Sequence, residues 1–103
     1  MAYELILTDD AHADIAETLA YISRTLENPP AAARFLDELD ACYRKLREYP
    51  LAFPLCRNIR LRQSGYHWAA IGSYLLFYRP APSEGRVYIL RLIYGGRDYE
   101  KLL

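Results

Sequence analysis

The pattern of hydrophobic and polar residues changes period along the chain, and its clearest single element is residues 86–94. This stretch is almost wholly β-branched, aromatic or aliphatic, which favours an extended strand. In a regular strand, Val87, Ile89 and Ile93 point to one face, and apolar side chains cover the other face as well. Because a strand that is apolar on both faces lies inside a sheet, we expect residues 86–94 to form its central strand.

Two amphipathic helices are predicted upstream, after a first strand at residues 3–7 that alternates to bury one face. An apolar residue recurs every three or four positions in both, which gives each helix one apolar stripe. The first stripe comprises Ala11, Ile15, Leu19, Ile22 and Leu26, and the second comprises Ala32, Phe35, Leu39, Cys42, Leu46 and Tyr49. The connection at residues 28–30 is short and rich in proline, so the helices must form an antiparallel hairpin. Cys42 lies on the second stripe, where we expect a packed core thiol and not a nucleophile.

The second half of the chain reads as strands. Apolar and basic residues alternate at 59–62, which predicts a strand with a basic outer face, and after a break the extended pattern resumes over residues 66–71. Residues 74–79 form the next strand, which the loop at 80–85 joins to the central strand as an antiparallel neighbour. The order is β-α-α-β-β-β. We therefore expect an α+β fold in which the N-terminal strand and the helical hairpin pack on an antiparallel sheet.

Length and composition limit the class of protein. The 103 residues, 52% of them hydrophobic and 25% charged, suit one globular domain over residues 1–103. No apolar run approaches a membrane span, and the N-terminus lacks the features of a signal peptide. Two cysteines without a secretory signal are typical of a cytoplasmic protein. His12 and His67 are isolated from each other and from the cysteines, and no glycine-rich phosphate loop is present, so we expect neither a metal nor a cofactor.

The formal net charge of zero conceals an uneven distribution. Residues 1–56 carry five Arg and Lys against ten Asp and Glu, whereas residues 57–103 carry eight against three. A neutral balance therefore does not exclude an anionic partner for one face. An arbitrary distribution over a solvated surface is the plainer interpretation. We favour a basic surface on the sheet side, because the arginines fall in or beside predicted strands.

Five arginines make up that basic surface: Arg60, Arg62, Arg79, Arg91 and Arg97. Guanidinium groups suit phosphate and carboxylate recognition because they are planar, permanently charged and bidentate. Taken singly, each is more often an ordinary salt-bridge partner. As a set they predict a surface that binds an RNA backbone or the acidic surface of another protein.

Two further residues allow two interpretations each. His67 could serve as a general base, since its unperturbed pKa lies near neutrality, but its place in a predicted strand beside Trp68 favours a structural or surface role. Tyr94 could stack on a base or a partner, or pack beside Gly95, and we favour packing.

The C-terminal half carries two motifs that resemble a known family. The segment Tyr74-Leu-Leu-Phe-Tyr-Arg79 is similar to the "YLIFYR" strand of the RelE/ParE superfamily of type II toxin–antitoxin toxins. The segment Ile89-Leu-Arg-Leu-Ile-Tyr-Gly-Gly-Arg-Asp98, with Leu102-Leu103 after it, is similar to the ending of those toxins. Strand, helical hairpin and three-stranded meander also match the layout of the superfamily. The resemblance implies a toxin that arrests growth, of the kind that stabilises plasmids.

Within the superfamily, RelE-like members cleave mRNA on the ribosome with a set of cations and a late tyrosine. The corresponding positions here fall at Asn58, Arg60, near Leu75, at Arg97 and near Leu103, so most of the set is absent. ParE-like members lack that set and are associated with inhibition of DNA gyrase. The resemblance is therefore closest to the ParE-like branch and implies action by binding, with no bond broken by the toxin's own side chains.

The resemblance also implies partners. A cognate antitoxin would neutralise the toxin, its C-terminal segment lying along the helical hairpin and the neighbouring sheet, and DNA gyrase would be the target. The alternative is an mRNA endonuclease with the ribosome as partner and a rearranged site of Arg60, Arg79, Arg97 and His67. A third reading is an inactive relative that only binds its antitoxin. Whether the chain forms a homodimer or a heterotetramer with the antitoxin stays open from the sequence.

Overall fold

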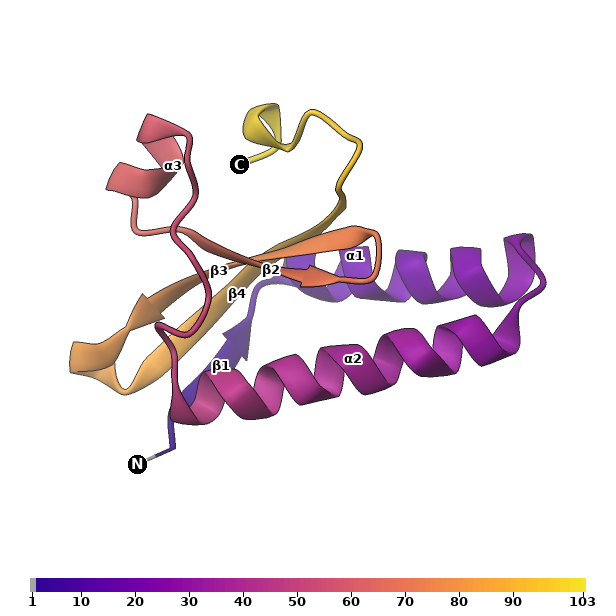
Figure 1. Ribbon diagram of the computed structural model, residues 1–103, viewed down its shortest axis with the longest axis horizontal. Helices are drawn as coiled ribbons and strands as arrows, with labels where there is room; N and C mark the ends of the chain where they lie inside the picture. Colours follow the sequence, from indigo (N-terminus) through magenta and orange to yellow (C-terminus); the bar gives the residue numbers. More distant parts are fainter. Residues whose placement is uncertain (1) are drawn as a thin grey trace.

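A four-stranded mixed sheet forms the centre of the computed structural model, which describes residues 2–103 (Figure 1). The strands are β1 (Glu4–Leu7), β2 (His67–Ile71), β3 (Tyr74–Ala81) and β4 (Arg86–Tyr94), in the order β1-β4-β3-β2. Strand β4 pairs with β1 in parallel and with β3 antiparallel. It therefore has a neighbour on each side, which confirms the expected central strand and the α+β class.

The helical hairpin covers one face of the sheet, as predicted (Figure 1). It consists of α1 (Asp9–Ala20), a π-helical turn (Tyr21–Thr25) and α2 (Pro29–Glu48). The predicted stripes supply most of the hairpin's core. The prediction is wrong for Leu26 and Tyr49, which are 53% and 63% exposed. Leu26 follows the π turn, whose wider winding rotates the stripe away from the sheet. Tyr49 lies after the last residue of α2, where the backbone has left the helical conformation.

The strand predicted at residues 59–62 is wrong, because these residues form the short helix α3 (Ile59–Gln63). The Asn58 side chain starts this helix by accepting a hydrogen bond from the backbone N–H of Leu61 at 3.2 Å. Leu61 alone is fully buried, while Arg60 and Arg62 are exposed. A single helical turn and a short strand can each bury one residue between two exposed residues. The alternating pattern therefore could not distinguish a helix from a strand at this position.

A bulge in β4 reverses which of its residues face the hairpin. The register with β3 shifts after Phe77, which leaves Leu90 as an extra residue without a partner across the ladder. Leu92 therefore packs on the hairpin side together with Ile89, whereas Ile93 packs on the opposite side against Phe77. The expectation that Ile93 shares a face with Ile89 is wrong for this reason.

The opposite face of the sheet is covered by α3 and by the segment after β4, which ends in a 3-10 turn (Tyr99–Lys101) (Figure 1). A smaller core lies beneath them, formed by Cys56, Leu61, Phe77 and Ile93. Among the helices of residues 2–103, none combines the length and the apolar character that crossing a membrane requires.

Candidate functional site

A groove of about 770 Å³ lies between the tip of the helical hairpin and one end of the sheet. The π-helical turn forms one wall. Its first residue, Tyr21, is 48% exposed, and Leu26, which follows the turn, is 53% exposed. Asn28 begins α2 directly afterwards by accepting a hydrogen bond from the N–H of Ala31 at 3.2 Å. The irregular turn thus leaves Leu26 at the groove, whereas a regular helix would direct this side chain toward the core.

Aromatic rings form the floor of the groove. The Tyr74 ring meets Phe35 on one side and Tyr94 on the other, edge to face, with centroids 5.8 Å apart in each pair. A Cβ atom at Gly96 would lie 2.6 Å from the Tyr94 ring, so only glycine allows that ring to lie where it does. Burial, followed by the neighbouring Tyr21 and Tyr94, raises the pKa of Tyr74. The Tyr74 hydroxyl therefore stays protonated further into the alkaline range than an exposed tyrosine.

Three charged residues border these rings: Arg34, Glu38 and Arg97. The Glu38 carboxylate accepts a hydrogen bond from the backbone N–H of Gly72 at 2.8 Å and so fastens the β2–β3 turn to α2. Arg34 and Arg97 are exposed, and neither makes an ion pair within residues 2–103. The groove therefore offers an apolar, aromatic floor beside two uncommitted guanidinium groups.

Of the residues predicted from sequence, Tyr94 and Arg97 meet at this groove. The Arg97 backbone N–H donates to the Tyr94 carbonyl at 3.0 Å, which closes the turn after β4. Tyr94 packs against Gly96 and Tyr74 and keeps 51% of its surface exposed, so it combines the packing that we favoured with an accessible ring.

Arg60, Arg62 and Arg79 lie elsewhere. The Arg60 guanidinium donates to the backbone oxygens of Leu103 at 2.9 Å and Glu100 at 2.5 Å, and so holds the C-terminal segment against α3. Arg62 is exposed on α3. Arg79 lies on β3 with its guanidinium 4.8 Å from the centre of the Tyr88 ring, a cation–π contact.

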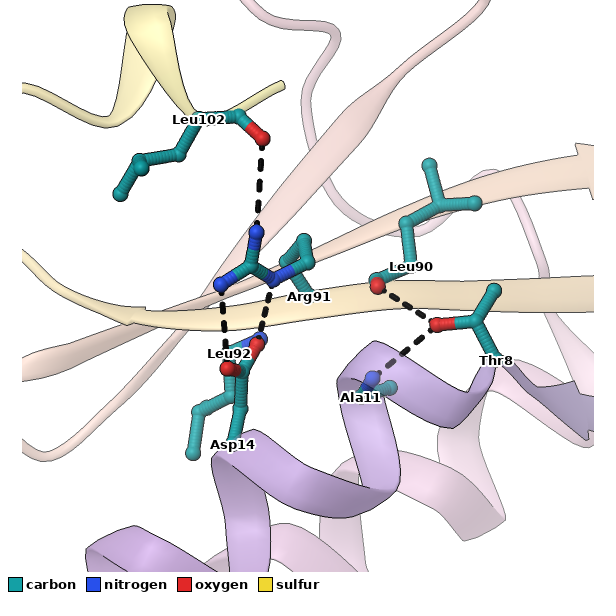
Figure 2. Close-up of polar contacts among 7 residues, drawn as sticks. All are labelled: Thr8, Ala11, Asp14, Leu90, Arg91, Leu92 and Leu102. Atoms are coloured by element: carbon teal, nitrogen blue, oxygen red, sulfur yellow. Dashed lines mark hydrogen bonds and ion pairs between the residues drawn. The ribbon is translucent and has the colours of Figure 1, made fainter.

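Arg91 is held inside the fold, as Figure 2 shows. Its guanidinium donates to both carboxylate oxygens of Asp14 on α1, at 2.6 and 3.1 Å, and to the Leu102 carbonyl at 3.4 Å. The hydrogen bond to Asp14 raises the pKa of Arg91, with burial opposing it. The side chains of Arg91 and Asp14 are only 22% and 13% exposed, so this pair joins α1, β4 and the C-terminal segment.

His67 belongs to the core. Its Nδ1 lies 2.7 Å from the carbonyl oxygen of Phe53, and its ring stacks on Tyr78 with centroids 5.3 Å apart. The residue is only 8% exposed. Arg97 lines the groove, whereas His67, Arg60 and Arg79 do not, so the four residues of the predicted nuclease site do not share this recess.

The sequence interpretation missed Tyr21, Arg34 and Tyr74 as groove residues. Tyr21 and Arg34 lie off the apolar stripes of their helices, and Tyr74 was assigned only to a strand. The one local signal was the Asn28-Pro29-Pro30 break, which locates the tip of the hairpin but not the wider turn before it.

Comparison with known proteins places this fold in a family. The sequence model described as "ParE toxin of type II toxin-antitoxin system, parDE" matches residues 5–99. The chain belongs to the ParE toxin family. This confirms the resemblance to the RelE/ParE superfamily and its ParE-like branch, and makes the chain a ParE-type toxin of a type II toxin–antitoxin system.

Two structures from toxin–antitoxin systems are among the solved structures that resemble this ParE-family chain. One is from the chromosomal ParDE system of P. aeruginosa, with a TM-score of 0.69 and 15% identity over 90% of this chain and 96% of that chain. The other is from the toxin–antitoxin complex RelBE2 of Mycobacterium tuberculosis, with a TM-score of 0.62 and 25% identity over 91% and 99%. The first likeness establishes the fold alone. No curated protein matched the chain.

Proposed function

We propose that this ParE-type toxin arrests growth by binding DNA gyrase and that a cognate antitoxin neutralises it. The observation that carries action by binding is the dispersal of the candidate catalytic groups. General acid–base chemistry on a phosphate needs cations and proton-transfer groups within hydrogen-bond reach of one centre. Arg60 instead holds backbone carbonyls, and His67 is stacked in the core.

The positions that would carry nuclease chemistry have structural tasks. Asn58 caps α3, and Leu75 packs in the smaller core. Leu103 supplies the backbone oxygen that Arg60 binds. These tasks support a toxin that works through its surface and not through a reaction at this face.

The groove suits the antitoxin. It lies where the helical hairpin meets the sheet, and it presents an aromatic floor together with Arg34 and Arg97. An antitoxin segment with apolar side chains spaced along one face and a carboxylate beside them would complement both features. The two solved structures compared above come from toxin–antitoxin systems, which supports a partner of this kind.

The remaining arginines serve as contacts on the sheet side. Arg60, Arg62 and Arg79 lie on α3 and β3, away from the groove, and their positive charge attracts acidic residues of the target or the antitoxin, although the Arg60 guanidinium also holds the C-terminal segment. Reversing all three to Glu, in a variant shown to be folded, should weaken growth arrest or its rescue by the antitoxin. Arg44→Glu with Arg47→Glu, exposed on α2 and outside the groove, is the charge-reversal control for growth arrest. Unchanged arrest and rescue in the triple variant would count against this surface.

Two assays on the purified toxin test the target. Supercoiling by gyrase should fall as toxin is added and recover when antitoxin is present, while translation by purified ribosomes should be unaffected. Inhibition of translation with mRNA cleavage would replace the gyrase proposal with the nuclease alternative. No effect in either assay, with no growth arrest on expression, would identify an inactive relative that only binds antitoxin.

A further inference from the structure

A second recess, of about 360 Å³, lies on the opposite face of the sheet from the hairpin. Its floor is formed by Cys56, Leu61 and Phe77, all of them at most 4% exposed. Trp68 from β2 and Tyr99 from the C-terminal segment add half-buried rings to the lining. Burial raises the pKa of the Cys56 thiol, so the floor carries no charge near neutral pH. Size and lining match those of small-molecule pockets in proteins.

The wall on the side of the C-terminal segment is held in place before any ligand binds. The Tyr99 ring packs on Phe77 with centroids 5.1 Å apart. Arg60 fixes the same segment through its hydrogen bonds to the backbone oxygens of Glu100 and Leu103. Because this wall is already ordered, the entropic cost of ligand binding is lower.

One positive and one negative side chain line the recess beside the rings, Arg57 and Glu100. Both residues are exposed, and neither makes an ion pair with another residue of the described chain, 2–103. A purely anionic ligand would meet Glu100 unfavourably, and a purely cationic ligand would meet Arg57 in the same way. A ligand with both charges complements the pair.

We propose that this recess binds a small zwitterion carrying an aromatic ring, the chemistry of a free aromatic amino acid. The ring would rest on the apolar floor between Trp68 and Tyr99. The ligand carboxylate would bind the Arg57 guanidinium, and its ammonium group would bind the Glu100 carboxylate. The recess shares no lining residue with the groove on the other face of the sheet.

Trp68 is the only tryptophan in the chain, so its fluorescence reports on this recess alone. The whole chain is titrated with L-phenylalanine while the tryptophan is excited selectively. We expect a saturable change with a dissociation constant of roughly a millimolar or tighter. Phenylpropionate, which lacks the ammonium group, and phenylethylamine, which lacks the carboxylate, should each bind about tenfold more weakly. Glycine, which lacks the ring, should produce no change.

Charge variants at exposed positions separate the two contacts. Arg57→Gln should weaken L-phenylalanine about tenfold without weakening phenylethylamine, and Glu100→Gln should weaken L-phenylalanine without weakening phenylpropionate. Arg62→Gln, also exposed and outside the recess, is the matched control and should leave all affinities unchanged. The proposal is overturned if L-phenylalanine gives no saturable signal, if either singly charged analogue binds as tightly, or if the recess variants behave like Arg62→Gln.

Discussion

Both oxygens of the Asp14 carboxylate on α1 accept hydrogen bonds from the Arg91 guanidinium on β4, at N···O distances of 2.6 and 3.1 Å (Figure 2). The two residues are 77 positions apart in the sequence. The same carboxylate accepts the backbone N–H of Leu92 at 3.0 Å. Strand β1 pairs with β4 only as far as Ile89. Beyond that point β4 has no strand partner on this side, and the Asp14 side chain of α1 accepts the hydrogen bond of the Leu92 N–H that a neighbouring strand would otherwise accept.

Removing Asp14 should therefore destabilise the protein well beyond the value of a surface ion pair. In Asp14→Ala, the half-buried Arg91 guanidinium and the Leu92 N–H both lose their partner, and we expect a loss of about 3 kcal/mol in the free energy of unfolding. The control is Asp40→Ala, whose exposed partner Arg44 is one helical turn away. That change should cost less than about 0.5 kcal/mol. Equal midpoint shifts of the two variants in urea denaturation would show that the Asp14 pair is not a fold-stabilising contact.

Thr8 makes the second contact of this kind, at the start of α1. Its hydroxyl accepts a hydrogen bond from the N–H of Ala11 at 3.0 Å and donates one to the Leu90 carbonyl at 2.8 Å. Thr8→Val keeps the shape of the side chain but removes both bonds, so we expect a loss of about 1–2 kcal/mol. Thr8→Ser keeps the hydroxyl and should stay within about 0.5 kcal/mol of the wild type. Thermal or urea unfolding measures both, and a Ser variant as unstable as the Val variant would contradict the cap.

Stability should fall at alkaline pH through the buried thiol of Cys42. Burial raises the pKa of this thiol from 9.0 to about 11, while the unfolded chain ionises near the lower value. Between these two values the unfolded state has lost the proton and the folded state still holds it, so rising pH favours unfolding. The free energy of unfolding should therefore drop by up to about 2 kcal/mol from pH 9 to 11.

Cys42→Val, close in volume, provides the control for that pH dependence. The decline from pH 9 to 11 should become shallower in this variant, because the thiol no longer titrates. Tyr43 contributes a further decline, since burial raises its pKa from 10.0 to about 12. A slope in Cys42→Val equal to that of the wild type would refute the role of the thiol.

If the groove holds the antitoxin, trimming its accessible aromatic ring should weaken the complex. Tyr94→Ala removes a half-exposed ring from the floor, and we expect about tenfold to a hundredfold weaker binding of the antitoxin with little change in stability. Tyr49→Ala removes a ring that is also exposed but does not line the groove, and should leave the affinity unchanged. Calorimetric titration of purified toxin with antitoxin measures both, and similar affinities for the two variants would move the interface elsewhere.

The amino-acid sequence by itself determined the central strand, the helical hairpin and the family. Apolar periodicity reports which side of an element is buried, and the stripes containing Phe35 and Leu39 did so correctly because that property is local. It also located Cys42 in the core. The motifs at Tyr74–Arg79 and after Ile89 indicated the RelE/ParE superfamily, and the family model over residues 5–99 established membership of the ParE toxin family.

Only the tertiary structure decided the features that depend on contacts between distant residues. The π turn before Leu26, the bulge at Leu90 and the helical form of residues 59–63 each escape the local pattern, because a short run of alternating residues is compatible with more than one backbone conformation. The partners of the arginines are likewise determined by the tertiary structure. Asp14 on α1 binds Arg91, and the C-terminal segment binds Arg60, so of these arginines only Arg97 lines the groove. Each guanidinium binds the oxygen atoms that the fold brings within hydrogen-bond distance.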